Sequence, residues 1–146
     1  MQRRNFIKGG LLASTLSLKS STLALAPIEF TPISAEERKM RVAKAQKLMA
    51  EKQIQAIILD AGINMNYFTG INWHPSERSM LAVIPVKGEI NFICPAFEED
   101  RFLEMAPAGT KVSIWEEDEN PFALTTCVLK GIGIEKGQIG MDEFCR

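Results

Sequence analysis

The spacing of apolar residues predicts alternating helices and strands from about residue 34 onwards. Ser34 is placed as a helix N-cap with Glu37 as its capping-box partner, and an amphipathic stretch follows to about Lys52. Further helices are predicted over residues 96–105 and from Pro121 to about residue 130, with a compact turn or short helix at 62–70. Apolar runs predict strands over residues 56–59, 80–86, 89–94, 111–115 and 138–141.

This order of elements predicts the fold class. Strands that alternate with helices form a sheet covered on both faces. Lys87 and Gly88 separate two consecutive apolar runs and are typical of a hairpin, so neighbouring strands there run antiparallel. We therefore expect an α/β domain with a mixed five-stranded sheet.

The first 26 residues have the pattern of a twin-arginine export signal. Arg3 and Arg4 precede an apolar pair and Lys8, and the apolar stretch at 9–18 is too short to span a bilayer. Residues 24–26 offer a small-x-small cleavage pattern, in which Pro27 disfavours cleavage after Ala26 and leaves cleavage after Ala24 open. This predicts a periplasmic or secreted protein, with a linker at 27–33. The alternative is a basic N-terminus without a sorting role.

Charge is divided unevenly along the chain. Residues 1–26 contain four bases and no acid, whereas the remaining 120 residues contain 13 bases and 18 acids. This acidic body argues against nucleic-acid binding, because no basic stripe remains to meet phosphates. The short apolar stretch likewise argues against a stable membrane anchor.

Cysteine and histidine usage argues against a disulfide framework or a metal site. The three cysteines are an odd number, their spacing fits no zinc pattern, and His74 is the single histidine. Cys94 and Cys127 are expected to be buried as small apolar residues. The acidic clusters at 98–100 and 116–119 are interpreted as solvated surface.

No self-sufficient active site is recognisable. Gly131 and Gly133 follow a predicted helix and lack the third glycine of a dinucleotide fingerprint. Neither a phosphate-binding loop nor a nucleophile elbow occurs. We expect no catalytic residue, metal ligand or cofactor site within the chain.

The most informative stretch is the connection formed by residues 64–78, because binding groups concentrate on loops. It contains Trp73 and His74, and it ends at Arg78, which can clamp a carboxylate through parallel hydrogen bonds. Tyr67 and Phe68 in the same stretch are interpreted as core residues.

A structural explanation of the other three residues remains equally open. Trp73 can cover the sheet, and Arg78 can pair with Glu77 or Glu98.

Several segments resemble the N-terminal domain of the creatinase/prolidase family, which contains Xaa-Pro peptidases and relatives such as creatinase. The most specific segment is Asn64 to Gly70 followed by Arg78. The others are Arg41, Leu48-Met49, residues 56–59, Gly88-Glu89, Pro95, Glu98 and Trp115-Glu116. The likeness covers residues 34–146.

The resemblance implies a three-layer α/β/α domain with a ribonuclease-H-like motif. In the family, a C-terminal pita-bread domain binds two divalent metal ions through two Asp, one His and two Glu. None of those positions exists here, so the chain is expected to be truncated before the catalytic domain and inactive alone. The resemblance also implies a homodimer in which this domain covers an active site.

On the same basis, Trp73, His74 and Arg78 are candidate substrate contacts in trans. Arg78 is expected to meet a substrate carboxylate, and Trp73 with His74 to line the pocket. The implied function is that of a non-catalytic domain of an exported Xaa-Pro dipeptidase- or aminopeptidase-like metallohydrolase, acting on a peptide or small amide. The alternatives are the same domain of a creatinase-like C–N hydrolase, and a stand-alone binding or dimerisation module.

Overall fold

The computed structural model describes residues 31–143 and residue 145. The predicted signal peptide, its cleavage site and linker residues 27–30 lie outside these residues. The remaining linker residues, 31–33, precede the first helix.

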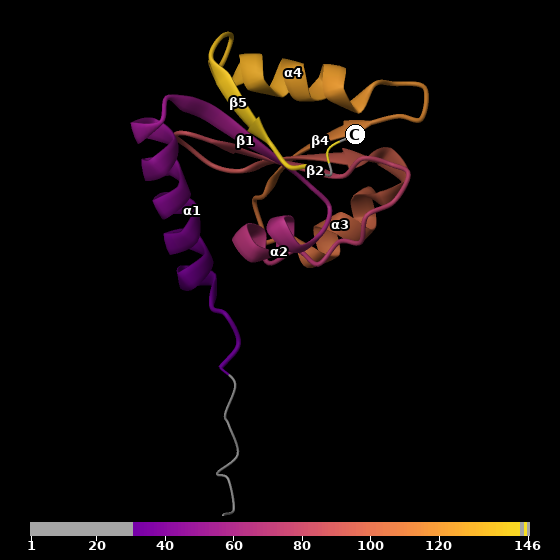
Figure 1. Cartoon of the computed structure of the whole chain (residues 1–146). Helices are drawn as coiled ribbons and strands as arrows, with labels where there is room; N and C mark the ends of the chain where they lie inside the picture. Colours follow the sequence, from indigo (N-terminus) through magenta and orange to yellow (C-terminus); the bar gives the residue numbers. More distant parts are fainter. Residues whose placement is uncertain (1–30, 144, 146) are drawn as a thin grey trace, which may run out of the picture. The chain divides into compact units, whose positions relative to one another are not determined.

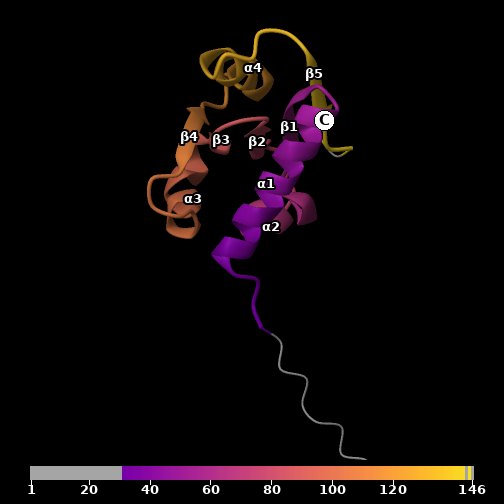
Figure 2. The same ribbon diagram turned by 90° about the vertical axis from the view of Figure 1, so that its left-hand side faces the viewer.

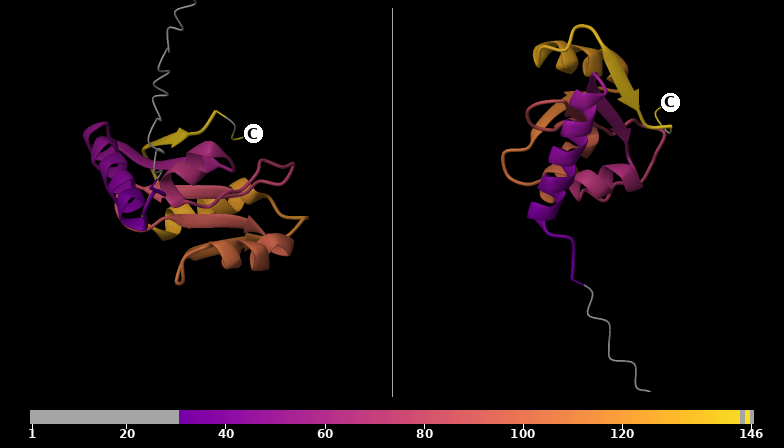
Figure 3. Two further views of the ribbon diagram at one scale, coloured as in Figure 1. Left: turned by 90° about the horizontal axis from the view of Figure 1, so that it is seen from below. Right: turned by 60° about the vertical axis from the view of Figure 1, so that its left-hand side comes forward.

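The described chain contains five strands in one mixed sheet with the order β4-β3-β2-β1-β5 (Figure 1). The strands are β1 (Ile54–Asp60), β2 (Leu81–Pro85), β3 (Asn91–Pro95), β4 (Lys111–Trp115) and β5 (Gln138–Met141). The helices are α1 (Ala35–Glu51), α2 (Ile63–Thr69), η1 (Ala96–Glu98), α3 (Glu99–Met105) and α4 (Pro121–Gly131). Seen from below, the strands follow one another from β5 (yellow) to β4 (Figure 3, left).

The pairing of the strands confirms the predicted mixed sheet. β2 is antiparallel to both β1 and β3, whereas β3 with β4 and β1 with β5 are parallel. The hairpin between β2 and β3 is therefore confirmed, although its connection extends over residues 86–90. Gln46 of α1 anchors this connection, because its side-chain amide donates to the carbonyls of Pro85 and Gly88 at 3.0 and 2.9 Å.

Alternate residues of the central strands face two separate cores. In β2, Leu81 and Val83 pack beneath α4 with Leu129, whereas Ala82 and Ile84 pack on the opposite face. The opposite face is covered by α2 and α3, whose Met65 and Phe102 are fully buried, and by α1. The three-layer α/β/α arrangement is thus confirmed, with α4 on one face and α2 and α3 on the other (Figures 1 and 2).

The predicted helix starts are also found. The Ser34 hydroxyl accepts from the Glu37 amide at 3.1 Å, and the Asn120 side chain accepts from the first amides of α4. The Glu37 carboxylate forms an ion pair with Arg41 one turn further along α1. None of the helices within the described residues is long and apolar enough to cross a membrane.

Two expectations about burial differ from the structure. Tyr67 is not a core residue: its side chain is 49% exposed, and the Arg41 guanidinium lies 4.2 Å from the ring centroid. Cys127 lies on the solvent side of α4 and is exposed, whereas Cys94 is buried as expected. The helix predicted from Ala96 to Met105 begins with the short turn η1 and continues as α3.

Candidate functional site

The candidate site is the loop of residues 72–79, called the candidate loop below. It lies at one edge of the sheet. Because β1, β3, β4 and β5 run in the same direction, their carboxyl ends meet at this edge. β2 runs the opposite way and begins there, so residues 72–79, which lead into it, lie at the same edge. In open α/β sheets the carboxyl edge is where ligands bind.

Local structure fixes both ends of this loop. Gly70 ends α2 with a left-handed φ of +81°, and its amide donates to the Asn66 carbonyl at 2.8 Å. The Thr69 hydroxyl then accepts from the Ile71 amide at 3.0 Å. At the other end, the buried indole of Trp115 donates to the Ser79 carbonyl at 3.1 Å. The loop is therefore held between α2 and the end of β4.

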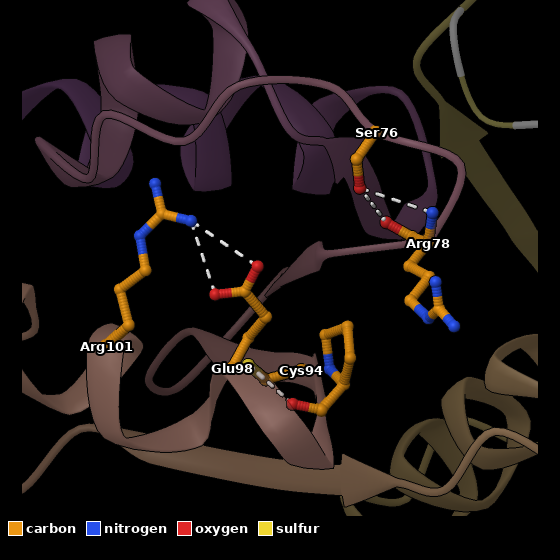
Figure 4. A network of polar contacts seen from close by, with 6 residues as sticks. Ser76, Arg78, Cys94, Glu98 and Arg101 are labelled. Atoms are coloured by element: carbon orange, nitrogen blue, oxygen red, sulfur yellow. Dashed lines mark hydrogen bonds and ion pairs between the residues drawn. The ribbon is translucent and has the colours of Figure 1, made fainter.

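Arg78 is held by its backbone and by its side chain. The Ser76 hydroxyl accepts from the Arg78 amide at 3.2 Å and donates to the Arg78 carbonyl at 2.9 Å (Figure 4). The guanidinium lies 4.9 Å from the centroid of the Phe97 ring, and Nη2 forms an ion pair with Glu117. The Arg78 side chain remains 42% exposed, so the cation is oriented and still reachable from solvent.

Trp73 occupies a different environment from Arg78. It is 4% exposed and packs against Phe102, with ring centroids 6.5 Å apart. The guanidinium of Arg101 lies 4.6 Å from the Trp73 centroid and pairs with Glu98 at 3.2 Å (Figure 4). The Trp73 ring is therefore covered by the domain itself, and its place in the core steadies the loop.

His74 lies next to Trp73 but is exposed, and it makes no hydrogen bond or ion pair with the described residues. The loop thus presents His74 and Arg78 outward and Trp73 inward.

The structural alternative for Arg78 is wrong about its partners, because the ion pair is made with Glu117 rather than Glu77 or Glu98. Sequence reasoning missed Phe97, Arg101 and Glu117 as neighbours of the loop. The available signal was that Phe97 and Glu117 each follow a predicted strand that ends at this edge.

No nucleophile stands out beside the loop among the described residues. Burial raises the pKa of the Cys94 thiol to about 12, with further contributions from Glu98 and Glu99. A thiol with that pKa stays protonated at neutral pH and is a poor nucleophile. Within residues 31–143 and 145, no group of three or more His, Cys, Asp or Glu side chains is placed to hold a metal ion.

Two acidic residues lie at the same edge of the sheet: Asp60 at the end of β1 and Asp142 just after β5. Burial raises the pKa of Asp60, although its carboxylate accepts a hydrogen bond from the Ala61 amide, and the nearby Asp142 adds to the rise. Asp142 in turn accepts from the Asn64 side chain at 2.8 Å. These contacts tie the end of β5 to α2.

In chemical terms, the group that the loop presents to solvent in a fixed place is a guanidinium, which is suited to contact with an anion. Arg78 supplies donors with a fixed direction.

The comparison with known protein families identifies the family of this domain. The family model of the creatinase/prolidase N-terminal domain matches residues 41–145, which is most of the chain. The chain belongs to this family. The creatinase/prolidase N-terminal domain is not the part that binds the catalytic metal ions in the family.

Curated relatives of this creatinase/prolidase domain are named as peptidases. An uncharacterized peptidase of Schizosaccharomyces pombe is 32% identical over 108 residues, covering 64% of this chain and 24% of the relative. A similar uncharacterized peptidase of Staphylococcus haemolyticus is 27% identical over 84 residues, covering 58% of this chain and 24% of the relative. The chain thus spans about a quarter of the length of the curated relatives that it matches.

Solved structures of the family have the same fold. A dipeptidase from Pyrococcus horikoshii matches with a TM-score of 0.62 and 27% identity, covering 73% of this chain and 29% of that one. A prolidase from Thermococcus sibiricus matches with a TM-score of 0.64 and 25% identity, covering 75% and 29%. The N-terminal domain of an Xaa-Pro dipeptidase from Lactobacillus brevis, at 19% identity and a TM-score of 0.63, supports the fold alone, covering 73% and 78%.

Proposed function

We propose that this chain is the non-catalytic N-terminal domain of an exported Xaa-Pro dipeptidase- or aminopeptidase-like metallohydrolase. In this proposal it covers the active site of a separate catalytic domain, which holds two divalent metal ions. Family membership and the peptidase names of the relatives support the hydrolase class. These names favour a peptidase over a creatinase-like C–N hydrolase. Comparing hydrolysis of an Xaa-Pro dipeptide with that of creatine by the whole protein distinguishes the two.

The observation that carries this proposal is the state of Arg78. Ser76 holds its backbone, and its guanidinium lies over Phe97 and pairs with Glu117, yet the side chain is partly open to solvent on a loop anchored at both ends. A preorganised, accessible cation fits recognition of a substrate carboxylate, because little ordering is left to be done on binding. In this proposal Arg78 binds that carboxylate, His74 lines the pocket, and Trp73 supports the loop from within.

The proposal also includes a homodimer, in which the loop of one subunit reaches the active site of the other. In a twofold dimer each subunit can offer its loop to its partner in the same way. The catalytic domain of each subunit then receives its cation for the substrate carboxylate, Arg78, from the other subunit.

Replacing Arg78 by alanine in the whole protein is expected to lower kcat/KM for an Xaa-Pro dipeptide by about 10- to 100-fold. This is the range for losing a hydrogen bond to a charged group, roughly 1.5–3 kcal/mol. The melting temperature is expected to change little, because the Arg78–Glu117 pair is exposed and such pairs stabilise weakly. Steady-state kinetics and thermal unfolding of the same preparation test both expectations.

Lys87→Ala serves as the matched control, because it removes an exposed cation from the hairpin connection, away from the carboxyl edge. It is expected to leave kcat/KM unchanged. Unchanged kinetics of Arg78→Ala, or a large fall in its melting temperature, would show that Arg78 is structural.

Export by the twin-arginine route is the remaining part of the proposal and rests on residues 1–26. Replacing Arg3 and Arg4 by lysine is expected to retain the protein in the cytoplasm. Fractionation of cells that express the two forms tests this, and equal periplasmic amounts of both would contradict export by this route.

A further inference from the structure

A second surface of the domain, separate from residues 72–79, has the features of a ligand site. A groove of about 660 Å³ lies on the face of the sheet that carries α1 and α3. Its walls are α1 on one side, and the end of α3 with residues 107–111 on the other. This volume falls within the range of small-molecule sites, about 300–1,000 Å³.

One face of α1 forms the first wall. Ala35, Arg38, Val42 and Gln46 line the groove at intervals of three to four residues, as expected for a single helical face. From the first to the last, this face extends about 16 Å along the helix axis. The groove is therefore long and narrow, with the start of α1 at one end and the hairpin connection at the other.

The floor of the groove is apolar. Val42, Phe68 and Phe92 pack against the core on this side of the sheet and also line the groove. Met105, which is 39% exposed, adds an apolar side chain to the opposite wall. A long apolar molecule bound here would remove its own surface and this floor from water, which favours binding.

The rim of the groove carries an excess of positive charge. Among the described residues that line it, the cations are Arg38, Lys39 and Lys111, and the single acid is Glu89. Glu89 pairs with Lys111 at 3.2 Å. Arg38 and Lys39 therefore have no carboxylate partner among the described residues.

Of these two cations, Arg38 has a buried donor that lacks a partner among the described residues. Nη1 donates to the Ile33 carbonyl at 3.1 Å, but the buried Nε has no hydrogen-bond partner among the described residues. A guanidinium has five N–H donors, and its strongest interactions are with carboxylates. The combination of an unpaired cation with an apolar floor specifies an amphiphilic anion as the complementary ligand.

We propose that this groove binds a small amphiphilic carboxylate, with its carboxylate at Arg38 and its apolar body over Val42, Phe68 and Phe92. A helix with its side chains is about 10–12 Å across and does not fit a groove of this volume. A twofold dimer through the groove would bring two positively charged rims together, which like-charge repulsion disfavours. This site is independent of the proposed peptidase function, since it shares no residue with loop 72–79.

Calorimetric titration of the 146-residue chain with sodium decanoate, kept below its micelle concentration, tests the proposal. Saturable binding at one site per chain is expected. Arg38→Met, which removes the charge but keeps an unbranched side chain, is expected to weaken binding about tenfold or more, in line with loss of a charge-assisted contact. Lys47→Met is the matched control, since Lys47 is exposed on α1 and does not line the groove.

Met105→Glu provides a second variant that does not alter Arg38. It places a negative charge on the exposed wall and is also expected to weaken decanoate binding, with an unchanged melting temperature. Decyl alcohol, which has the same chain without the charge, is expected to bind less tightly than decanoate. Absence of saturable decanoate binding, or equal affinity of the Arg38→Met and Lys47→Met variants, would overturn the proposal.

Discussion

Replacing Phe102 by alanine is expected to destabilise the domain by about 3–5 kcal/mol. Phe102 is fully buried, and its ring lies 5.0 Å from that of Phe92 and 6.5 Å from that of Trp73, measured between centroids. The shorter side chain would leave a cavity among residues of α3, β3 and the candidate loop. Domains of this size are generally stable by about 5–15 kcal/mol, so this loss is a large share of the total.

Denaturant unfolding of the two forms measures this effect, and Leu103→Ala is the control on the same helix. Leu103 is 48% exposed, so its replacement is expected to cost well under half as much. Because Phe102 packs against Trp73, its replacement is also expected to loosen the loop that carries Arg78. Equal effects of the two substitutions would contradict the packing described for this face of the sheet.

Gly70→Ala is expected to destabilise the domain by about 1–3 kcal/mol from backbone strain alone, with a further cost from overlap. Gly70 has a φ of +81°, which residues with a Cβ adopt unfavourably. An added Cβ would also lie 2.7 Å from both Cζ and Nε of Arg38, closer than van der Waals contact allows. Thermal or denaturant unfolding measures the sum.

Substitution of Gly109 separates the cost of backbone strain from the cost of overlap. Gly109 has nearly the same φ of +83°, and no described atom lies within 4 Å of an added Cβ. Gly109→Ala is expected to show the backbone cost without the overlap, and therefore a smaller loss of stability. In a chain that already carries Arg38→Ala, the extra cost at position 70 is expected to fall towards that at position 109. Equal losses for Gly70→Ala and Gly109→Ala would contradict this expectation and show that the Arg38 side chain moves aside without measurable cost.

Much of the fold can be predicted from the sequence, because the central strands are buried on both faces. Each residue of β2 from Leu81 to Ile84 contacts one core or the other, so the apolar run is continuous and unmistakable. The caps at Ser34 and Asn120 are local interactions, so sequence alone locates them. The hairpin connection is longer than predicted, and contacts distant in sequence hold it, since Gln46 anchors Pro85 and Gly88.

The errors arise where contacts distant in sequence decide the burial of an aromatic or small side chain. Tyr67 resembles a core residue by type, but Arg41 covers its ring from α1 and leaves it at the surface. Cys127 is on the outer side of α4, a detail that the weak amphipathic pattern of that helix does not reveal.

Residue types and the family resemblance locate the candidate loop, but they do not give the environments of its members. Sequence proximity favours a nearby partner for Arg78, whereas the loop brings it to Glu117, 39 residues away. Trp73 and Arg78 are separated by only a few positions, yet one faces the core and the other faces solvent. Such differences depend on how the loop crosses the carboxyl edge, which local spacing does not encode.

We propose that this domain supplies Arg78 to a reaction catalysed by another subunit. The most direct test mixes two defective forms of the whole protein under conditions of subunit exchange. One form carries Arg78→Ala, and the other carries an intact Arg78 with the metal ligands of its catalytic domain removed. If Arg78 acts in trans, the mixture is predicted to regain about a quarter of the normal rate, because roughly half of the dimers are mixed and each holds one complete site. Mixed dimers that form but give no more activity than the two parent forms do would contradict this proposal.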